Sequence, residues 1–436
     1  MDLAFLFKNL NKVKKEQGMR TGLDYGEQKM ELEVPDAVQV LHMQDVPAVI
    51  EPEKAVFEAL EDPIGSLPLS ELARGKESAC VVISDVTRPV PNHLLLPPLL
   101  QTLEKSGISR EDITILIATG MHRPNQGSEL AGLVGQHIMD NYSIRNHYCQ
   151  KSKEMSCIDS IQGTPIEINR HYLEADLKIL TGLIEPHFYA GYSGGRKSIL
   201  PGISSLETMK FMHSYQVIDH PQVANCVLEG NIFHHYGLQV AEKAGVDFIC
   251  NVCINHDREV SAIFAGHYDQ AHMAGCDFVY RHAVVEMNEP MDMVIISGGG
   301  YPLDATFYQI SKALTCAKDM LKKGGTIVVA CECREGLGSE DFCSIMRSCP
   351  HPEHFFNHYS EPQNFVIDQW CAQNIFQAID HAGQVYVYSS GLRDQDVEGF
   401  GAVKIHDLQK TIDQLLPSHH RVAVSPSGPY IVGRVL

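Results

Sequence analysis

The sequence predicts an α/β protein with two domains, each a mostly parallel sheet with flanking helices. Short β-branched runs alternate with stretches of helical leucine spacing, and polar, glycine- and proline-containing loops follow the ends of those runs. The length of 436 residues exceeds what one hydrophobic core usually organises. Because ligands of such folds bind at the carboxyl ends of the strands, we expect an active site there, in the cleft between the domains.

The first half of the chain has the strand, loop, helix, strand order that is typical of parallel pairing. An amphipathic segment is expected first, followed by weak strand patterns around residues 30–34 and 38–40. The clearer elements are a helix over 92–105 and strands over 80–84, 113–118, 177–183, 248–254 and 260–265.

A second strand–helix–strand pattern, which begins after residue 286, indicates the second domain. A helix over 267–286 leads to it, and a strand over 291–297, a helix over 304–321 and a strand over 326–331 begin it. Two further strands are expected, over 385–389 and 402–405. We therefore predict an N-terminal cofactor-binding domain over 1–286, which the tail 413–436 could rejoin, and a C-terminal Rossmann-like domain over 287–412.

Charge and composition exclude several classes of protein. The net charge of -19, from 35 basic and 54 acidic residues, argues against nucleic acid or an anionic membrane as partner. No run reaches the roughly 18 apolar residues of a membrane span, and lysines interrupt the apolar start. Thirteen cysteines without a framework favour a reducing compartment, so a cytoplasmic protein is expected. Cys250 and Cys253 lie in a strand pattern, where core packing explains them better than a zinc site.

Three loops that follow predicted strands carry the residues of a candidate site. Ser84-Asp-Val-Thr-Arg-Pro follows the first, Thr119-Gly-Met-His-Arg-Pro the second, and the segment 185–202 the third. The last holds an imidazole, two consecutive glycines, a guanidinium and an amine, a composition that suits an anionic ligand. The candidates of this half are Asp85, Val86, Thr87, Arg88, His122, His187, Lys197 and His213.

The second domain adds candidates on one predicted helix. Tyr308, Gln309 and Lys312 can share a helix face. Trp370, the only tryptophan, is equally well explained as a pocket wall or as a core residue. Gly298-Gly-Gly300 lacks dinucleotide spacing and indicates a tight turn. The cluster His351, His354 and His358 would share a face if helical, but no fourth metal ligand is evident, and its role stays open.

Taken together, these motifs resemble the nickel-dependent lactate racemase family. The resemblance rests on the Asp85–Arg88 turn, the His122 loop, Glu185-Pro-His through Gly202, the spacing of Lys197 and His213, and Tyr308-Gln-x-x-Lys312. It extends over most of the chain. It implies a racemase or epimerase of a small 2-hydroxy acid, with lactate as the default substrate.

The resemblance also implies a cofactor and a role for each residue. The cofactor is a nickel-pincer nucleotide, nickel pyridinium-3,5-bisthiocarboxylate mononucleotide, attached covalently at Lys197, with nickel bound by His213. Asp85, Val86, Thr87 and Arg88 would bind the nucleotide. Arg88, Tyr308, Gln309, Lys312 and Trp370 would contact substrate, and cofactor-synthesis enzymes would be partners.

Removing the 2-hydrogen of a 2-hydroxy acid as a proton is difficult beside a carboxylate, whereas hydride transfer with removal of the hydroxyl proton leaves a planar 2-oxo acid. Two opposed bases are then needed, and His122 and His187 suit these roles. Another 2-hydroxy acid (malate, 2-hydroxyglutarate, phenyllactate or an aldonate) and a non-catalytic nucleotide- or phosphate-binding protein remain alternatives. Assembly as a homo-oligomer is also left open.

Overall fold

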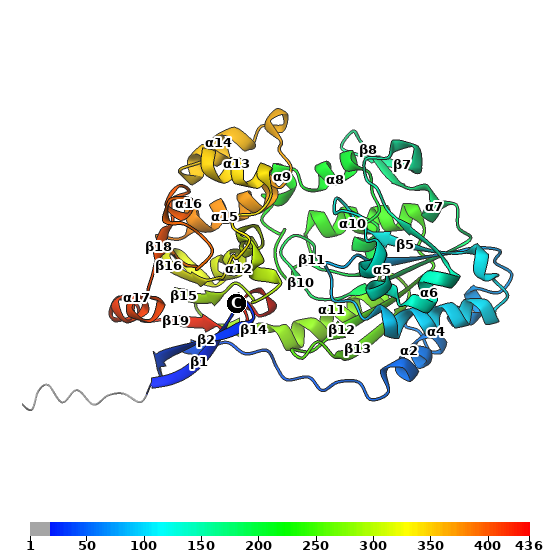
Figure 1. Ribbon diagram of the computed structural model, residues 1–436, viewed down its shortest axis with the longest axis horizontal. Helices are drawn as coiled ribbons and strands as arrows, with labels where there is room; N and C mark the ends of the chain where they lie inside the picture. The colour runs from blue at the N-terminus through cyan, green and yellow to red at the C-terminus, as the bar shows by residue number, and fades with distance from the viewer. Residues whose placement is uncertain (1–17) are drawn as a thin grey trace, which may run out of the picture. The chain divides into compact units, whose positions relative to one another are not determined.

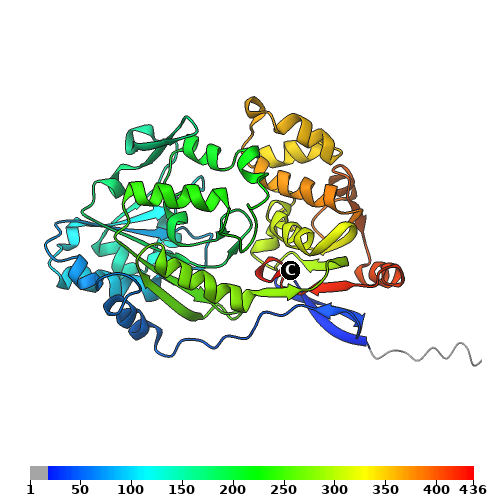
Figure 2. The ribbon, with the colours of Figure 1, turned by 180° about the vertical axis from the view of Figure 1, so that it is seen from behind.

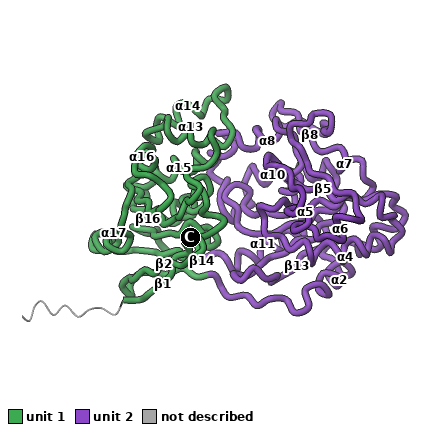
Figure 3. Tube along the Cα trace, in the orientation of Figure 1, with its two compact units in different colours: residues 1–42, 285–436 green, residues 43–284 purple. Residues whose placement is uncertain are grey.

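A computed structural model describes residues 18–436, which form two compact units (Figure 3). One unit spans residues 43–284, and the other combines the described part of 1–42 with 285–436. The expected amphipathic segment at the start of the chain falls largely on residues 1–17, which lie outside the described residues.

The unit 43–284 is built on a six-stranded sheet with the order β13-β12-β9-β4-β5-β6. The five strands from β12 to β6 are parallel, and β13 is an antiparallel edge. The central strands read as near-continuous apolar runs because helices cover both faces. The strands are β4 (Ala79–Ser84), β5 (Ile113–Ala118), β6 (Ser143–Asn146), β9 (Leu177–Leu183), β12 (Phe248–Ile254) and β13 (Val260–Gly266).

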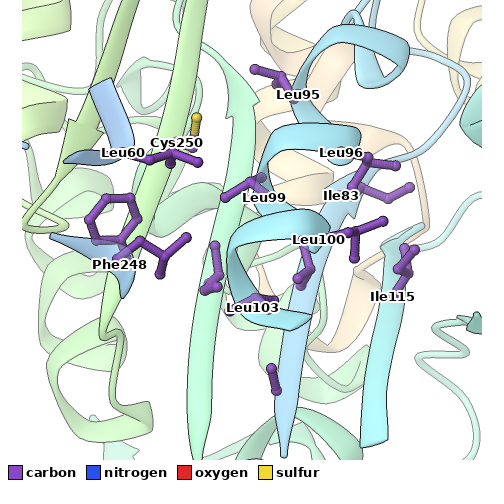
Figure 4. Packing of buried hydrophobic residues seen from close by; sticks show 14 of the residues in the cluster. Leu60, Ile83, Leu95, Leu96, Leu99, Leu100, Leu103, Ile115, Phe248 and Cys250 are labelled. Carbon is purple, nitrogen blue, oxygen red and sulfur yellow. The ribbon is translucent and has the colours of Figure 1, made fainter. Parts of the chain in front are cut away.

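The core of this unit lies under helix α4 (Asn92–Lys105). Its leucines 95, 96, 99, 100 and 103 follow helical spacing and pack on Ile83 of β4 and Ile115 of β5 (Figure 4). Phe248 of β12 and Leu60 of α2 (Pro52–Glu61) extend the same cluster. The other helices are α3 (Leu69–Leu72), α5 (Gly127–Val134), α6 (Gln136–Asn141), α7 (Arg170–Leu173), α8 (Leu206–Met212), α9 (Tyr215–Ile218), α10 (Ile232–Ala244) and α11 (Gln270–Ala283).

The unit that contains residues 285–436 (unit 1 in Figure 3) has its own six-stranded sheet, of order β18-β17-β16-β15-β19-β3, and every pair in it is parallel. Helices flank this sheet (Figures 1 and 2). Its strands are β15 (Met291–Ser297), β16 (Leu321–Ala330), β17 (Gln384–Tyr388), β18 (Val403–Ile405), β19 (Val422–Ser425) and β3 (Gln39–Val40). Its helices are α12 (Phe307–Met320), α13 (Glu340–Ser348), α14 (Pro352–Tyr359), α15 (Gln369–His381), α16 (Asp394–Glu398) and α17 (Leu408–Leu415).

The division of the chain differs from the expected 1–286 and 287–412 at both ends. The junction near residue 284 lies close to the expected boundary at 286, but residues 18–42 and 413–436 belong to the same unit as residues 285–412. Strand β19, from the tail, pairs with β15 and with β3. The hairpin of β1 (Gly18–Tyr25) and β2 (Gln28–Pro35) places Leu23 and Leu32 in the core of this unit, and β20 (Val432–Val435) pairs with β14 (Val284–Met287). Burial of Leu23 and Leu32 in the hairpin and of Val422 and Val424 in β19 holds these segments in this unit.

Among residues 18–436, no helix is long and apolar enough to cross a membrane. The thirteen cysteines all lie in this range, and each is a free thiol. Cys250 and Cys253 are buried in β12, where burial raises the pKa of the Cys250 thiol to about 12. They are core residues, as their strand pattern indicated.

Candidate active site

Three loops meet at one edge of the sheet in the unit 43–284. They follow β9, β4 and β5, which are parallel neighbours in that order. Parallel neighbours end on the same side, so the loops that begin at Asp85, Thr119 and Ile184 emerge together. Two antiparallel pairs complete this unit, β7 (Met155–Ile161) with β8 (Thr164–Asn169) and β10 (Pro186–His187) with β11 (Gly191–Tyr192).

His122 is bound to a buried carboxylate. Its Nδ1 lies 2.7 Å from Oδ2 of Asp85, whose side chain is 5% exposed, against 60% for His122. Oδ1 of Asp85 accepts a hydrogen bond from the Thr87 hydroxyl at 2.6 Å. Burial acts to raise the pKa of Asp85, but the bonds from His122 and Thr87 and the charge of Arg88 outweigh it, and the pKa lies below its ordinary value. Asp85 is thus an acceptor that orients the His122 ring.

Arg88 is held by a carboxylate from the neighbouring loop. Its Nη1 donates to Oε1 of Glu185 at 3.1 Å, and both side chains are partly exposed. Sequence reasoning gave Glu185 no role. Val86, expected to contact a nucleotide, is 45% exposed, and its N–H donates to Oδ1 of Asn125 at 3.4 Å.

His187 is buried, with 7% of its surface exposed. Its Nδ1 accepts hydrogen bonds from the backbone N–H groups of Tyr189 at 3.1 Å and Ala190 at 3.3 Å. The ring also stacks on Phe188, with a centroid distance of 5.1 Å. The turn between β10 and β11 therefore fixes both the position and the orientation of this imidazole.

The glycines and the arginine of the 185–202 segment serve the fold. Gly194 has φ 75° and ψ -176°, a conformation that only glycine adopts readily, and the N–H of Gly195 donates to Oδ1 of Asn251 at 2.8 Å. Arg196 is buried, and its Nη2 donates to the carbonyls of Ala190 and Tyr192 at 2.6 and 3.2 Å. The expectation that these residues suit an anionic ligand is not matched by these contacts, because the Gly195 N–H and the Arg196 guanidinium are bound within the protein.

Arg196→Met should lower the free energy of unfolding by about 1 to 3 kcal/mol for each carbonyl that loses its donor. Urea unfolding measures this. Arg123→Met is a matched control, because Arg123 is 71% exposed in its ion pair with Glu129 and should contribute less than about 1 kcal/mol. Equal effects of the two substitutions would contradict this role for Arg196.

Lys197 lies in the short 3-10 helix Gly195–Ser198 and is half-buried. His213 follows the last residue of α8, is 8% exposed, and its Nδ1 lies 3.0 Å from the Met209 carbonyl. Burial, with a smaller effect of the Lys197 charge, lowers the pKa of His213 to about 4. The ring of Tyr189 contacts that of His213 edge-on at 5.9 Å. Lys197, His213 and the His187 turn thus belong to one neighbourhood.

The candidates on α12 and α15 also form a group. Tyr308, Gln309 and Lys312 lie in the first two turns of α12, and Trp370 lies in the first turn of α15. Nε1 of Trp370, a residue that is 5% exposed, donates to the Tyr308 hydroxyl at 3.1 Å. Joint action of this group with the His122 and His187 group stays a prediction.

The histidine cluster of α14 does not form a metal site. His351, His354 and His358 are exposed, and in residues 18–436 no group of three or more His, Cys, Asp or Glu side chains is placed to hold a metal ion.

Two buried histidines should make the protein less stable in acid. Burial lowers the pKa of both His147 and His213 to about 4, below the ordinary 6.5. As the pH falls from about 6.5 to 4, the unfolded chain binds these protons and the folded chain does not, so stability present above pH 6.5 is lost. The shifts correspond to roughly 3 kcal/mol for each group. Urea unfolding at several pH values measures how the free energy of unfolding depends on pH. His147→Gln should make this dependence weaker, whereas His406→Gln, at an exposed position, should leave it unchanged.

Comparisons with known proteins match most of this chain. Residues 25–225 match the family model of the lactate racemase N-terminal domain, and residues 286–431 match that of the lactate racemase C-terminal domain. The lactate racemase of Thermoanaerobacterium thermosaccharolyticum is 35% identical over 94% of this chain and 98% of its own length. That of Lactiplantibacillus plantarum is 37% identical over 86% of this chain and 89% of its own.

Solved structures agree as well. The lactate racemase apoprotein of Thermoanaerobacterium thermosaccharolyticum superposes with a TM-score of 0.88 at 34% identity, covering 95% of this chain and all of that one. A crystal structure of a protein from Thermotoga maritima, with a TM-score of 0.65, covers 91% of this chain and all of that one at 17% identity, and shares the fold.

Proposed function

The chain belongs to the lactate racemase family, and on this premise we propose that it interconverts the two enantiomers of lactate. It is an isomerase, as the sequence predicted. The observation that carries the proposal is that the loops of His122 and His187 follow β5 and β9, the parallel strands on either side of β4, and that Tyr189 of the His187 turn contacts His213.

The residues present fit a nickel-pincer nucleotide. Because a carbonyl only accepts, Nδ1 of His213 carries its proton toward Met209, and the lone pair of the neutral ring lies on Nε2, as a metal ligand requires. Neutral imidazole is a good ligand for nickel, and the lowered pKa keeps this ring neutral. Lys197 supplies the amine for covalent attachment. When bound, such a group would supply a hydride acceptor.

His122 would handle the hydroxyl proton on one side of the substrate. Its Nε2 takes the proton, and the Asp85 carboxylate, already bonded to Nδ1, stabilises the imidazolium that forms. His187 would serve the opposite enantiomer. The Thr87 hydroxyl keeps Asp85 in position during these changes.

The substrate carboxylate would be held by residues of α12. Gln309 lies in the first turn of α12 and Lys312 in the second. The helix dipole favours an anion at this N-terminal end. Tyr308, bonded to Trp370, would bound the apolar side of the substrate. Arg88, paired with Glu185, would assist in holding the substrate.

The experiment is a racemisation assay with protein loaded by coexpression with cofactor-synthesis enzymes. Each lactate enantiomer is incubated separately and followed by chiral chromatography, with malate, 2-hydroxyglutarate, phenyllactate and an aldonate in parallel. Conversion of each lactate enantiomer to an equal mixture of the two supports the proposal. Conversion of another acid alone would change the substrate, and no conversion of any by nickel-loaded protein would favour a binding protein.

The free thiols favour a reducing compartment, so a cytoplasmic location stays our prediction. Binding of nucleic acid is not expected at a net charge of -19.

A further inference from the structure

The two candidate bases differ in what binds their Nδ1 atoms. Nδ1 of His122 faces Oδ2 of Asp85 at 2.7 Å, and an ionised carboxylate only accepts hydrogen bonds. Nδ1 of His122 therefore carries a proton, and in the neutral ring the lone pair lies on Nε2.

His187 shows the reverse arrangement. Its Nδ1 accepts from the backbone N–H groups of Tyr189 and Ala190, at 3.1 and 3.3 Å. Backbone N–H groups only donate, so the lone pair lies on Nδ1 and the proton of the neutral ring lies on Nε2. A proton on Nδ1 would point at two N–H groups.

Aromatic, charged and titratable groups lie around His187. Its ring neighbours are Phe188 and Tyr189, at centroid distances of 5.1 and 5.8 Å. Charged and titratable groups on or against the same turn include Glu185, which is paired with Arg88, and His213, which contacts Tyr189. Arg196 also lies against it, and its Nη2 donates to the carbonyls of Ala190 and Tyr192. Both of these partners of Nδ1, the N–H groups of Tyr189 and Ala190, are donors.

We propose that the two histidines rest in opposite tautomers, and that the N–H groups of Tyr189 and Ala190 are positioning groups that hold His187 as an Nε2–H donor. The consequence for racemisation rests on the proposed function. His122 can accept a hydroxyl proton at Nε2 directly. His187 can accept a hydroxyl proton at Nε2 only after the proton on Nε2 leaves to solvent and another proton binds Nδ1. This exchange leaves the ring neutral, but it breaks both hydrogen bonds from the amide N–H groups. The turn between β10 and β11 must therefore release the ring before His187 acts as a base.

Nitrogen-15 NMR of the histidine-labelled full chain, without cofactor, tests the tautomers directly. Two-bond correlations between ring nitrogens and carbon-bound protons distinguish Nδ1–H from Nε2–H rings. His122→Gln and His187→Gln assign the two signals by their disappearance. We expect an Nδ1–H pattern for His122 and an Nε2–H pattern for His187 at neutral pH.

Asp85→Asn provides the matched control, because an amide can accept from or donate to Nδ1. The tautomer of His122 should become mixed in this variant, and that of His187 should not change. If His187→Gln does not fold, Overhauser contacts with the Phe188 and Tyr189 rings assign the signal instead. The same tautomer for both rings, or an Nδ1–H pattern for His187, would overturn the inference.

This readout is independent of turnover. Opposite tautomers in a protein that does not racemise lactate would leave the inference standing and reject the proposed function. Identical tautomers in an active racemase would reject the inference alone.

Discussion

His122→Gln should lower the turnover of lactate by about 10²- to 10⁴-fold, the usual contribution of a positioned general acid–base group. Glutamine keeps a polar side chain of similar length but cannot take the hydroxyl proton. The fall should appear in kcat for both enantiomers, because each is substrate in one direction and product in the other. Initial rates with loaded protein and chiral detection measure it.

His137→Gln is the control for this substitution, since His137 is exposed on α6, outside the candidate site. Its rates should equal those of the unaltered protein. Nickel content should be unchanged in the His122 variant, because His122 is not proposed to bind the metal. Unchanged turnover in His122→Gln, with normal nickel content, would remove His122 from the mechanism.

Lys197→Arg should abolish the covalent mass adduct while keeping a positive charge at this half-buried position. An amine can form an amide with an acid group of the cofactor, whereas a guanidinium, which stays protonated, is a poor nucleophile. Intact-protein mass spectrometry after coexpression with cofactor-synthesis enzymes measures the adduct, and the chiral assay measures the accompanying loss of racemisation.

Lys210→Arg serves as the matched variant, because Lys210 lies on α8 and forms an exposed ion pair with Glu207. It should retain both adduct and activity. An adduct of undiminished yield in Lys197→Arg would move the attachment point to another residue.

Long apolar runs made most of the fold predictable. The strands 113–118, 177–183, 248–254 and 291–297 and the helix 92–105 have the bounds that the sequence indicated. Because both faces of a parallel sheet are buried, each strand is a nearly continuous apolar run, and the run ends where a polar loop begins. The same reasoning placed the loops of Asp85, His122 and His187 at one edge of the sheet.

Pairings between distant short segments were not predictable. Strand β3 has two residues and β19 has four, and they pair although nearly the whole length of the chain separates them in sequence. Neither carries enough local pattern to indicate its partner, so residues 18–42 were expected in the other domain and the tail was left as a possible part of it.

Within the site, residue types were predictable but partners were not. The sequence singled out Asp85 and His122 without indicating that their side chains bond to each other. It suggested an anionic ligand for Arg196, which instead lies buried against two carbonyls. Such partners depend on how loops cross after the sheet has formed, and no spacing in the sequence records that.

The central claim is that the 2-hydrogen of lactate moves as a hydride to and from the cofactor while His122 and His187 handle the hydroxyl proton, and the fate of the 2-hydrogen tests it most directly. Loaded protein converts one lactate enantiomer in deuterium oxide, and the isolated product is examined for deuterium at carbon 2. The account predicts an equal mixture of enantiomers that retains protium at carbon 2, because the hydrogen leaves and returns as hydride. Deuterium at carbon 2 in proportion to racemisation would show proton abstraction and contradict the account.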